Sequence, residues 1–407
     1  MAYDTSTPAL ILALHDHGGL GAVRSLARIG VPVYATHPPG RTPATRSRLV
    51  RDRFPWSIDE AAPADTVEFL LDVGRRIGRP TVLFPSEDVS SILVAEHADA
   101  LRERFILPEV PVELPRSLID KRQLFEICRR TDIPVPETLA PATLAEVEQF
   151  ARAASFPVVI KAIHGWRLRG RSERKTIIVH SADELLENHR VMAVDDDLNA
   201  VLQEYIPGGP DAVWIYAAYA NSDAEPLVAF VGNKLREYPV DTGVTTIAVN
   251  VANPDVAEAG RRFVGEVGYR GIIDLDFRYD ARDGQYKPLD FNPRPGANFR
   301  TFVDEDGIDV VRAAYLDLTG QRFSPAPPRI GRKWMVENWD VAAGRRYIAE
   351  GRLTPWAWGR SLHGVQETAW FAHEDLLPFV AMLVQLVVTA WGWARRRLGP
   401  GRSARPS

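Results

Sequence analysis

Cysteine is nearly absent from this chain of 407 residues, because Cys128 stands alone and leaves no partner for an internal disulfide. The opening residues lack the basic and apolar segments of a secretory signal. A net charge of only -4, from 49 basic and 53 acidic side chains, gives no overall field that would attract nucleic acid. The sequence therefore predicts a protein of the reducing cytoplasm with no nucleic-acid partner.

Glycine-based nucleotide motifs are missing or incomplete. No Gly-x-x-x-x-Gly-Lys-Ser/Thr element occurs, which argues against a P-loop enzyme. The segment Gly18-Gly19-Leu20-Gly21 follows an apolar run, but it lacks the full glycine spacing and the downstream acidic residue of a dinucleotide-binding turn. We interpret these glycines as a structural turn.

Apolar runs and turns divide the chain into parts of different character. Apolar strands at 9–14, 31–35 and 81–84 alternate with helical patterns, which predicts a parallel α/β sheet. The proline-rich stretch 107–115 ends this first part. Residues 116–323 carry further strands separated by helices and acidic turns, so the middle of the chain is predicted to be α+β.

Acidic and amide side chains gather in a predicted hairpin near residue 280. Asp276 lies on its first strand, and Asp290 and Asn292 lie at alternate positions of its second strand, so the three side chains can share one face. Such oxygen ligands suit Mg²⁺, which completes its shell with water and phosphate oxygens. Arg294, one alternate step further, would supply a fixed cation for phosphate or a developing oxyanion. A hairpin with solvated acidic residues is the alternative interpretation of the same spacing.

The segment Asp290-Phe291-Asn292-Pro293-Arg294 resembles the C-terminal signature of the ATP-grasp superfamily, in which Glu is the commoner first residue. Here Asp keeps the charge on a shorter side chain. Other segments resemble superfamily motifs in the expected order. Lys121 at a helix start and Lys161 at a strand end are similar to the two nucleotide-binding lysines.

The hinge between the two grasping subdomains also has a counterpart. Residues 203–208 resemble this hinge, in which the backbone of residues 204–206 would meet the adenine, and Asp211 falls where the family places a ribose-binding acid. The predicted nucleotide contacts in this segment are Gln203, Glu204, Tyr205, Ile206 and Asp211. The phosphate-covering loop, residues 164–171, departs from the usual glycine-rich pattern, because it holds two glycines and three arginines. Arginine side chains would therefore do more of the phosphate holding.

The resemblance implies a fold that is α/β and α+β. It predicts an N-terminal Rossmann-like (pre-ATP-grasp) domain at 1–115 and a two-subdomain ATP-grasp fold at 116–323. The lid subdomain is expected at about 155–200, and a helical C-terminal extension follows at 324–407.

Within the superfamily, residues 84–88 and 133–138 are similar to the carboxylate-amine ligases related to D-aspartate ligase. Lys234 and Arg236 resemble a segment that lies near the active site in that group, so they are predicted to contact the transferred phosphoryl group or the substrate carboxylate; a solvated turn is the alternative. His15 and Asp88 follow predicted strands, where open parallel sheets bind ligands, and are candidate substrate contacts.

The resemblance implies an ATP-dependent ligase that joins a small-molecule carboxylate to an amine through an acyl phosphate. Catalysis is assigned to Arg294, Lys234 and Arg236, and Asp276, Asp290 and Asn292 are assigned to the metal. The implied cofactors are ATP and Mg²⁺, with Mn²⁺ as a substitute, and a homodimer is a further prediction. The alternatives are a carboxylate-thiol ligase, a carboxylase, or a non-catalytic nucleotide-binding protein at the membrane.

The C-terminal stretch differs in kind from the rest. Residues 376–394 hold no charge, and Arg395, Arg396, Arg397, Arg402 and Arg405 follow without an acidic residue among them. Their length and flank fit contact with the inner face of a membrane. The alternative is a helix packed on the body of the protein and followed by a basic tail.

Overall fold

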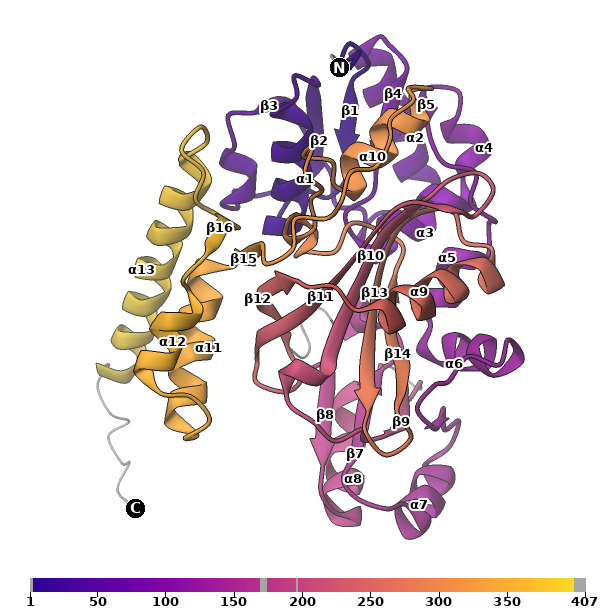
Figure 1. Cartoon of the computed structure of the whole chain (residues 1–407), viewed down its shortest axis with the longest axis vertical. Coiled ribbons are helices and arrows are strands. Elements are labelled where there is room, and N and C mark those ends of the chain that lie inside the picture. The colour runs from indigo at the N-terminus through magenta and orange to yellow at the C-terminus, as the bar shows by residue number, and fades with distance from the viewer. Residues whose placement is uncertain (1–2, 169–173, 195–196, 399–407) are drawn as a thin grey trace, which may run out of the picture.

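The computed structural model describes residues 3–168, 174–194 and 197–398. Within these ranges three sheets follow one another along the long axis of the molecule, and the C-terminal helices lie to one side (Figure 1). Parallel and antiparallel sheets occur together with helices, so the predicted α/β and α+β fold class is confirmed.

The N-terminal sheet is parallel, with the strand order β3-β2-β1-β4-β5. Its elements are β1 (Ala9–Ile11), α1 (His17–Ala27), β2 (Val33–His37), β3 (Val50–Pro55), α2 (Pro63–Ile77), β4 (Thr81–Phe84), α3 (Asp88–Glu96), α4 (Ala98–Leu101) and β5 (Phe105–Ile106). The strand order changes direction between β1 and β4. The carboxyl ends of these two strands are therefore where a ligand of such a sheet is expected.

The small sheet is antiparallel, with the order β6-β9-β7-β8. The elements of this part are α5 (Leu114–Ile119), α6 (Lys121–Arg130), β6 (Thr138–Leu139), α7 (Leu144–Ala153), β7 (Val158–Ala162), β8 (Thr176–Val179), α8 (Ala182–Asn188) and β9 (Ala200–Glu204). Because β6 pairs with β9, the sheet begins earlier in the chain than the predicted lid at about 155–200. Arg169 and Arg171 of the predicted phosphate loop lie outside the described residues.

The large sheet has the order β14-β13-β10-β11-β12-β15-β16 and is antiparallel except between its last two strands. Its strands and the remaining helices are β10 (Val213–Ala220), β11 (Pro226–Tyr238), β12 (Val244–Asn250), α9 (Pro254–Val267), β13 (Gly271–Asp280), β14 (Gln285–Asn292), α10 (Val310–Leu318), β15 (Lys333–Met335), α11 (Glu337–Ala349), α12 (Pro355–Ser361), β16 (Val365–Thr368) and α13 (Leu377–Leu398). The C-terminal extension thus adds two strands to the central sheet.

The glycines after β1 serve close packing. Asp16 caps α1 by accepting a hydrogen bond from the Gly19 amide at 3.0 Å. A Cβ at Gly18 would lie 3.2 Å from Cα of Ala297, in the loop that follows β14. The glycines therefore let α1 approach that loop closely. They lie in the first turns of α1, so the interpretation of these residues as a turn before the helix is wrong.

A buried ion pair joins the N-terminal domain to the chain just before α13. Arg24 of α1 donates from Nε to Asp375 Oδ2 at 3.2 Å, and both residues are almost fully buried. Asp375 also accepts hydrogen bonds from Ser47 Oγ at 2.8 Å and from the Arg48 amide at 3.0 Å. These contacts fix the start of the last helix against the N-terminal domain.

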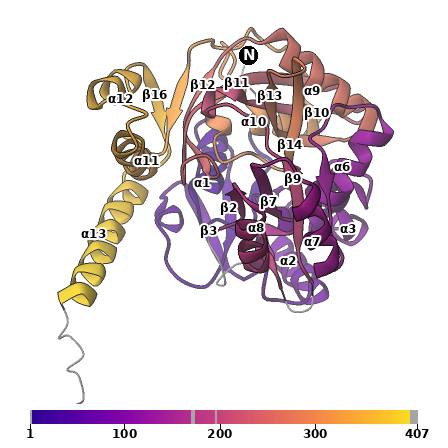
Figure 2. The same cartoon turned by 90° about the horizontal axis from the view of Figure 1, so that it is seen from below.

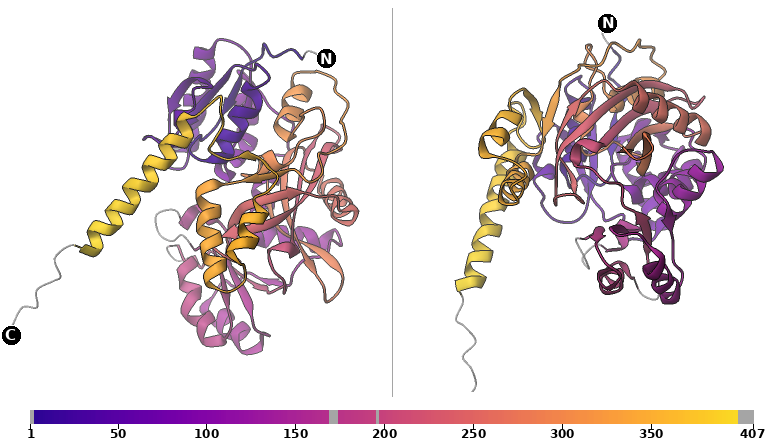
Figure 3. Two further views of the ribbon diagram at one scale, coloured as in Figure 1. Left: turned by 60° about the vertical axis from the view of Figure 1, so that its left-hand side comes forward. Right: turned by 60° about the horizontal axis from the view of Figure 1, so that its bottom comes forward.

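Helix α13 leaves the body of the protein soon after it begins (Figures 2 and 3). Phe379 and Met382 pack on the main core, whereas every side chain from Leu383 to Trp391 is exposed. The alternative of a helix packed on the body is therefore wrong for the stretch from Leu383 to Trp391. Over the described part of the chain, no helix combines the length and apolarity needed to cross a membrane.

Candidate active site

The predicted hairpin brings four polar residues onto one face of the large sheet. Asp276 of β13 lies directly opposite Asp290 of β14, and Asp274 lies directly opposite Asn292. Directly opposed residues of an antiparallel pair share a face, and so do alternate residues of one strand. The structure thus brings together the three residues predicted from the sequence, Asp276, Asp290 and Asn292.

Two lysines from distant segments converge on Asp290. Lys121 Nζ, at the start of α6, lies 2.9 Å from Asp290 Oδ1, and Lys161 Nζ, in β7, lies 3.9 Å from Asp290 Oδ2. Burial alone would raise the pKa of Asp290, but the charges of Lys121 and Lys161 outweigh it and bring the pKa to about 2. Asp290 is therefore ionised at neutral pH.

Lys161 is a buried cation with an incomplete set of partners. Its side chain is nearly inaccessible to solvent, and within the described residues its Nζ donates no hydrogen bond. Burial, together with the nearby charge of Lys121, lowers its pKa despite the attraction of Asp290. An ammonium in this state is expected to bind an anionic ligand that supplies the missing acceptors.

A third lysine reaches the same face from β11. Lys234 Nζ donates to Asp276 Oδ2 at 2.6 Å. Burial disfavours its charge, but the carboxylate of Asp276 more than compensates, so the pKa of Lys234 is raised. Each of the two opposed carboxylates is therefore held by a lysine, Asp276 by Lys234 and Asp290 by Lys121.

Arg294 links this face to the N-terminal domain. It donates from Nη2 to Asn292 Oδ1 at 3.0 Å and from Nε to Asp88 Oδ1 at 2.8 Å. Asp88 is the first residue of α3, which follows β4. His15 follows β1, and its Nε2 lies 3.1 Å from Oε1 of Glu87, the residue before Asp88. The two candidate substrate contacts, His15 and Asp88, therefore lie where the N-terminal sheet meets the central sheet, and Asp88 touches Arg294.

Asp274 belongs to the same face but was not among the predicted site residues. Burial and the neighbouring Asp276 raise its pKa to about 7. A Cβ at Gly296 would lie 2.5 Å from Asp274 Cγ, so only glycine permits the loop after Arg294 to approach this carboxyl. Asp274 lies two residues before Asp276 on the same strand, so the alternation of side chains would have predicted it on the same face.

Arg236 does not reach the site, contrary to its predicted role. Its Nε and Nη2 donate to the two carboxylate oxygens of Asp340 on α11, each at 2.9 Å, and both residues are buried. The register between β11 and β12 shifts after Lys234, so a β-bulge turns Arg236 to the opposite face of the sheet. Strict alternation of side chains along β11 would have predicted that Lys234 and Arg236 lie on the same face of the sheet.

The hinge residues line a cleft of about 490 Å³. Gln203, Glu204, Tyr205 and Ile206 contribute to its wall, and Lys161 lines it from β7. Arg278 donates to the Ile206 carbonyl at 2.8 Å and so fixes the hinge backbone. Asp211 is exposed in a turn and does not contribute to the described lining of the cleft, so its contact with a ribose stays a prediction.

The residues at β13 and β14 fit a magnesium ion by their donor chemistry. Asp276 and Asp290 present carboxylate oxygens side by side, which is the ligand type that Mg²⁺ takes from proteins. Asn292 Oδ1 accepts from Arg294 here, and its Nδ2 donates to Asp274. In the part of the chain that the structure describes, no three His, Cys, Asp or Glu side chains form a metal-binding group.

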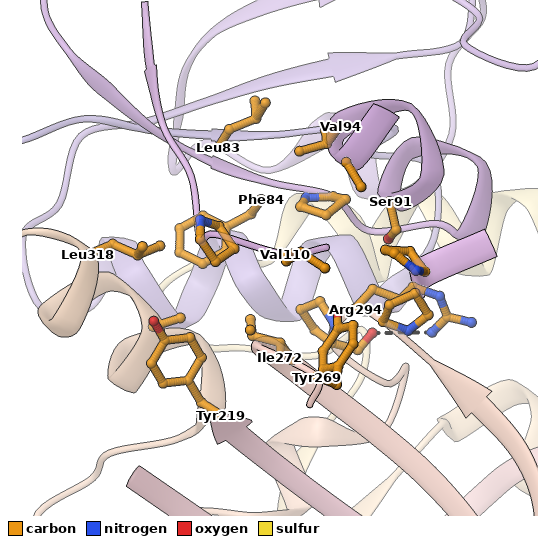
Figure 4. Close-up of a pocket in the computed structure, with 18 of the residues that line it drawn as sticks. Leu83, Phe84, Ser91, Val94, Val110, Tyr219, Tyr269, Ile272, Arg294 and Leu318 are labelled. Carbon is orange, nitrogen blue, oxygen red and sulfur yellow. Dashed lines mark hydrogen bonds between the residues drawn. The ribbon is translucent and has the colours of Figure 1, made fainter. Parts of the chain in front are cut away.

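A separate apolar cavity lies beside Arg294 (Figure 4). It has about 620 Å³ of free space and lies between the N-terminal domain and the central sheet. Leu83, Val94 and Ile272 are typical of its lining. The guanidinium of Arg294 pairs with Asp88 and Asn292. The polar end of this side chain therefore lies at the face of the large sheet that carries Asp274, Asp276, Asp290 and Asn292, which we call the charged face.

Comparison with known proteins agrees with this geometry. No protein-family model matches the chain. D-aspartate ligase from Enterococcus faecium (strain Aus0004) is 26% identical over 285 residues, covering 64% of this chain and 68% of that protein. The large chain of carbamoyl phosphate synthase from Thermus thermophilus is 25% identical over 338 residues, which cover 78% of this chain but 31% of that enzyme.

Solved structures share the fold at low sequence identity. L-amino acid ligase from Bacillus licheniformis aligns with a TM-score of 0.59 at 16% identity, covering 78% of this chain and 75% of that protein. N5-carboxyaminoimidazole synthetase from Staphylococcus aureus, complexed with ADP, aligns with a TM-score of 0.61 at 13% identity and covers 81% of each chain. In its fold, in the order of its charged residues along the chain and in these relatives, the chain is similar to ATP-grasp proteins of the carboxylate-amine ligase group.

Proposed function

We propose that the protein is an ATP-dependent ligase that joins a carboxylate to an amine through an acyl phosphate. The convergence of Lys121, Lys161 and Asp290 at the end of the hinge cleft carries this proposal. Lys161 both lines the cleft and lies beside Asp290, so a nucleotide base in the cleft would have its phosphates directed at the charged face. The similarity to D-aspartate ligase supports the reaction class.

The described residues provide a place for each part of ATP. The base would lie against the hinge backbone of residues 204–206, and the phosphates would supply the acceptors that Lys161 Nζ lacks. Asp276, Asp290 and Asn292 would hold Mg²⁺, which when bound neutralises charge on phosphate oxygens. Mn²⁺ would fit the same oxygen ligands.

The reaction would proceed in two halves. A carboxylate oxygen of the substrate attacks the γ-phosphorus of ATP, and Lys161 and Lys234 stabilise the negative charge spread over the phosphoryl oxygens. An acyl phosphate and ADP result. The amine then attacks the carbonyl carbon, and the fixed charge of Arg294 stabilises the oxyanion before phosphate leaves. The product is an amide.

The rival functions differ in the acceptor or in turnover. A carboxylate-thiol ligase or a carboxylase would use the same nucleotide site with another acceptor. A non-catalytic nucleotide-binding protein has no need of Arg294 and Lys234 beside the lysines and carboxylates of the nucleotide site. The amine acceptor is favoured because the relative D-aspartate ligase is named for an amino acid, a substrate that carries both a carboxylate and an amine.

A phosphate-release screen tests the proposal. Purified protein is supplied with ATP, Mg²⁺ and a matrix of amino acids, other carboxylates and amines. We expect phosphate and ADP in equal amounts, with an amide detected by mass spectrometry, only where both an acid and an amine are present. Turnover that requires a thiol or bicarbonate instead would identify a rival ligase, and ATP binding without turnover in every mixture would refute an enzyme.

We also propose that α13 contacts an anionic membrane surface from the cytoplasmic side. Its exposed stretch Leu383 to Trp391 is mostly apolar, and three arginines occupy positions 395–397 after it. We expect the protein to sediment with vesicles that contain anionic lipid, and the variant Val384→Asp/Val388→Asp to remain in the supernatant. Equal sedimentation of both would contradict lipid contact. A dimer of the wild type that the variant lacks would show that a second copy covers the helix instead.

A further inference from the structure

Glu237 directly follows Arg236 at the irregularity between β11 and β12. Lys234 pairs with Ala248 of β12, and after the irregularity Glu237 pairs with Thr245. The charge of the Glu237 carboxyl group interacts with those of Lys234 and Asp276. Glu237 is 5% exposed. A buried carboxyl group therefore lies near the lysine that holds Asp276.

The strand partner of Glu237 contacts an amide group whose oxygen accepts no hydrogen bond within the described residues. Thr245 Oγ1, opposite Glu237, accepts a hydrogen bond from Asn298 Nδ2 at 3.2 Å. Asn298 belongs to the loop after Arg294 and is 7% exposed, and its Oδ1 has no hydrogen-bond partner among the described residues. A buried acceptor left without a donor is destabilising. The arrangement therefore favours a ligand that brings N–H groups.

The surroundings keep Glu237 able to exchange a proton near neutral pH. Burial, together with the charges of Asp241 and Asp276, raises its pKa to about 7 although the charges of Lys234 and Arg278 lower it. Within the described residues no hydrogen bond or ion pair engages its carboxylate, whereas Asp276 is held by Lys234. Glu237 is therefore a buried carboxyl group that is still available to a ligand.

We propose that Glu237 and Asn298 bind the acceptor amine and that Glu237 takes its proton during amide formation. The inference rests on the proposed ligase function. The amine nitrogen donates to Asn298 Oδ1 and attacks the carbonyl carbon of the acyl phosphate. The C–N bond forms as the C–O bond to phosphate breaks. The proton lost from nitrogen passes to the Glu237 carboxylate and then to the departing phosphate, which leaves as the monohydrogen dianion.

Glu237→Gln separates the two half-reactions. With the acid and amine found in the phosphate-release screen, we expect amide formation to fall by about 10²–10⁴-fold, the range of a lost general base. The wild-type rate should decrease more steeply than that of the variant as the pH falls below 7, because protonated Glu237 cannot accept a proton, whereas protonation of the free amine affects both proteins alike. Hydroxylamine, which is uncharged at neutral pH, should still trap the acyl phosphate as a hydroxamate at the wild-type rate.

Two further variants complete the test. Asn298→Ala should raise the KM for the amine and leave the affinity for ATP, measured by calorimetry, unchanged. Glu225→Gln, in the exposed turn before β11, is the matched control and should behave as wild type. Wild-type amide formation in Glu237→Gln, or an equal loss of hydroxamate, would overturn the inference. A wild-type protein without turnover in any mixture would instead refute the ligase function.

Discussion

Asp290→Asn is expected to lower ATP-dependent phosphate release by about 10²–10³-fold, as for the loss of one preorganised electrostatic group. The wild-type carboxylate is charged at every working pH, because its pKa lies at about 2. The asparagine would leave the ammonium groups of Lys121 and Lys161 next to each other without the negative charge that now separates them. Phosphate release at saturating concentrations of both substrates measures the loss.

The control for this variant lies in the same hairpin. Asp283→Asn changes an exposed acid in the turn between β13 and β14, and Lys287, its partner, also pairs with Asp280. We expect activity close to wild type. Wild-type turnover in Asp290→Asn, or an equal loss in Asp283→Asn, would remove the basis for placing the triphosphate at this face.

Asp375→Ala is expected to destabilise the protein by about 3–5 kcal/mol, the range for removing one partner of a buried ion pair. The substitution leaves the guanidinium of Arg24 buried without its counter-charge, and it also removes the acceptor of Ser47 Oγ and the Arg48 amide. Denaturant unfolding followed by circular dichroism gives the free energy of unfolding.

Glu374→Ala is the matched comparison, because it changes the preceding acid in the chain. Glu374 pairs with Arg28 in a partly exposed contact, so its removal should cost less than about 1 kcal/mol. Equal free energies of unfolding for the two variants would show that the Arg24–Asp375 pair does not fix the C-terminal extension.

Local patterns in the sequence predicted much of the charged face. Asp276, Asp290 and Asn292 were found because a short acidic turn joins two alternating strands, and such a hairpin places its partners by spacing alone. The same alternation applied one step back would have included Asp274. Lys121 and Lys161 are different, because their contact with Asp290 joins segments far apart in the chain and was predicted only through the family resemblance.

Features set by long-range pairing were not predictable. Arg236 leaves the face of Lys234 at an irregularity that depends on how β11 pairs with β12, and the residues themselves carry no signal of it. The C-terminal segment 333–373 gave no clear pattern, because β15 is three residues long and gains its stability by pairing with β12. Short strands of this kind are defined by their partner in the sheet.

Oxygen-18 in the substrate carboxylate tests the acyl-phosphate route most directly. If the carboxylate attacks the γ-phosphorus of ATP, one labelled oxygen must leave with the inorganic phosphate when the amine displaces it. Mass spectrometry of the released phosphate should therefore show a single labelled oxygen per turnover. Unlabelled phosphate, or label recovered in AMP, would contradict the account.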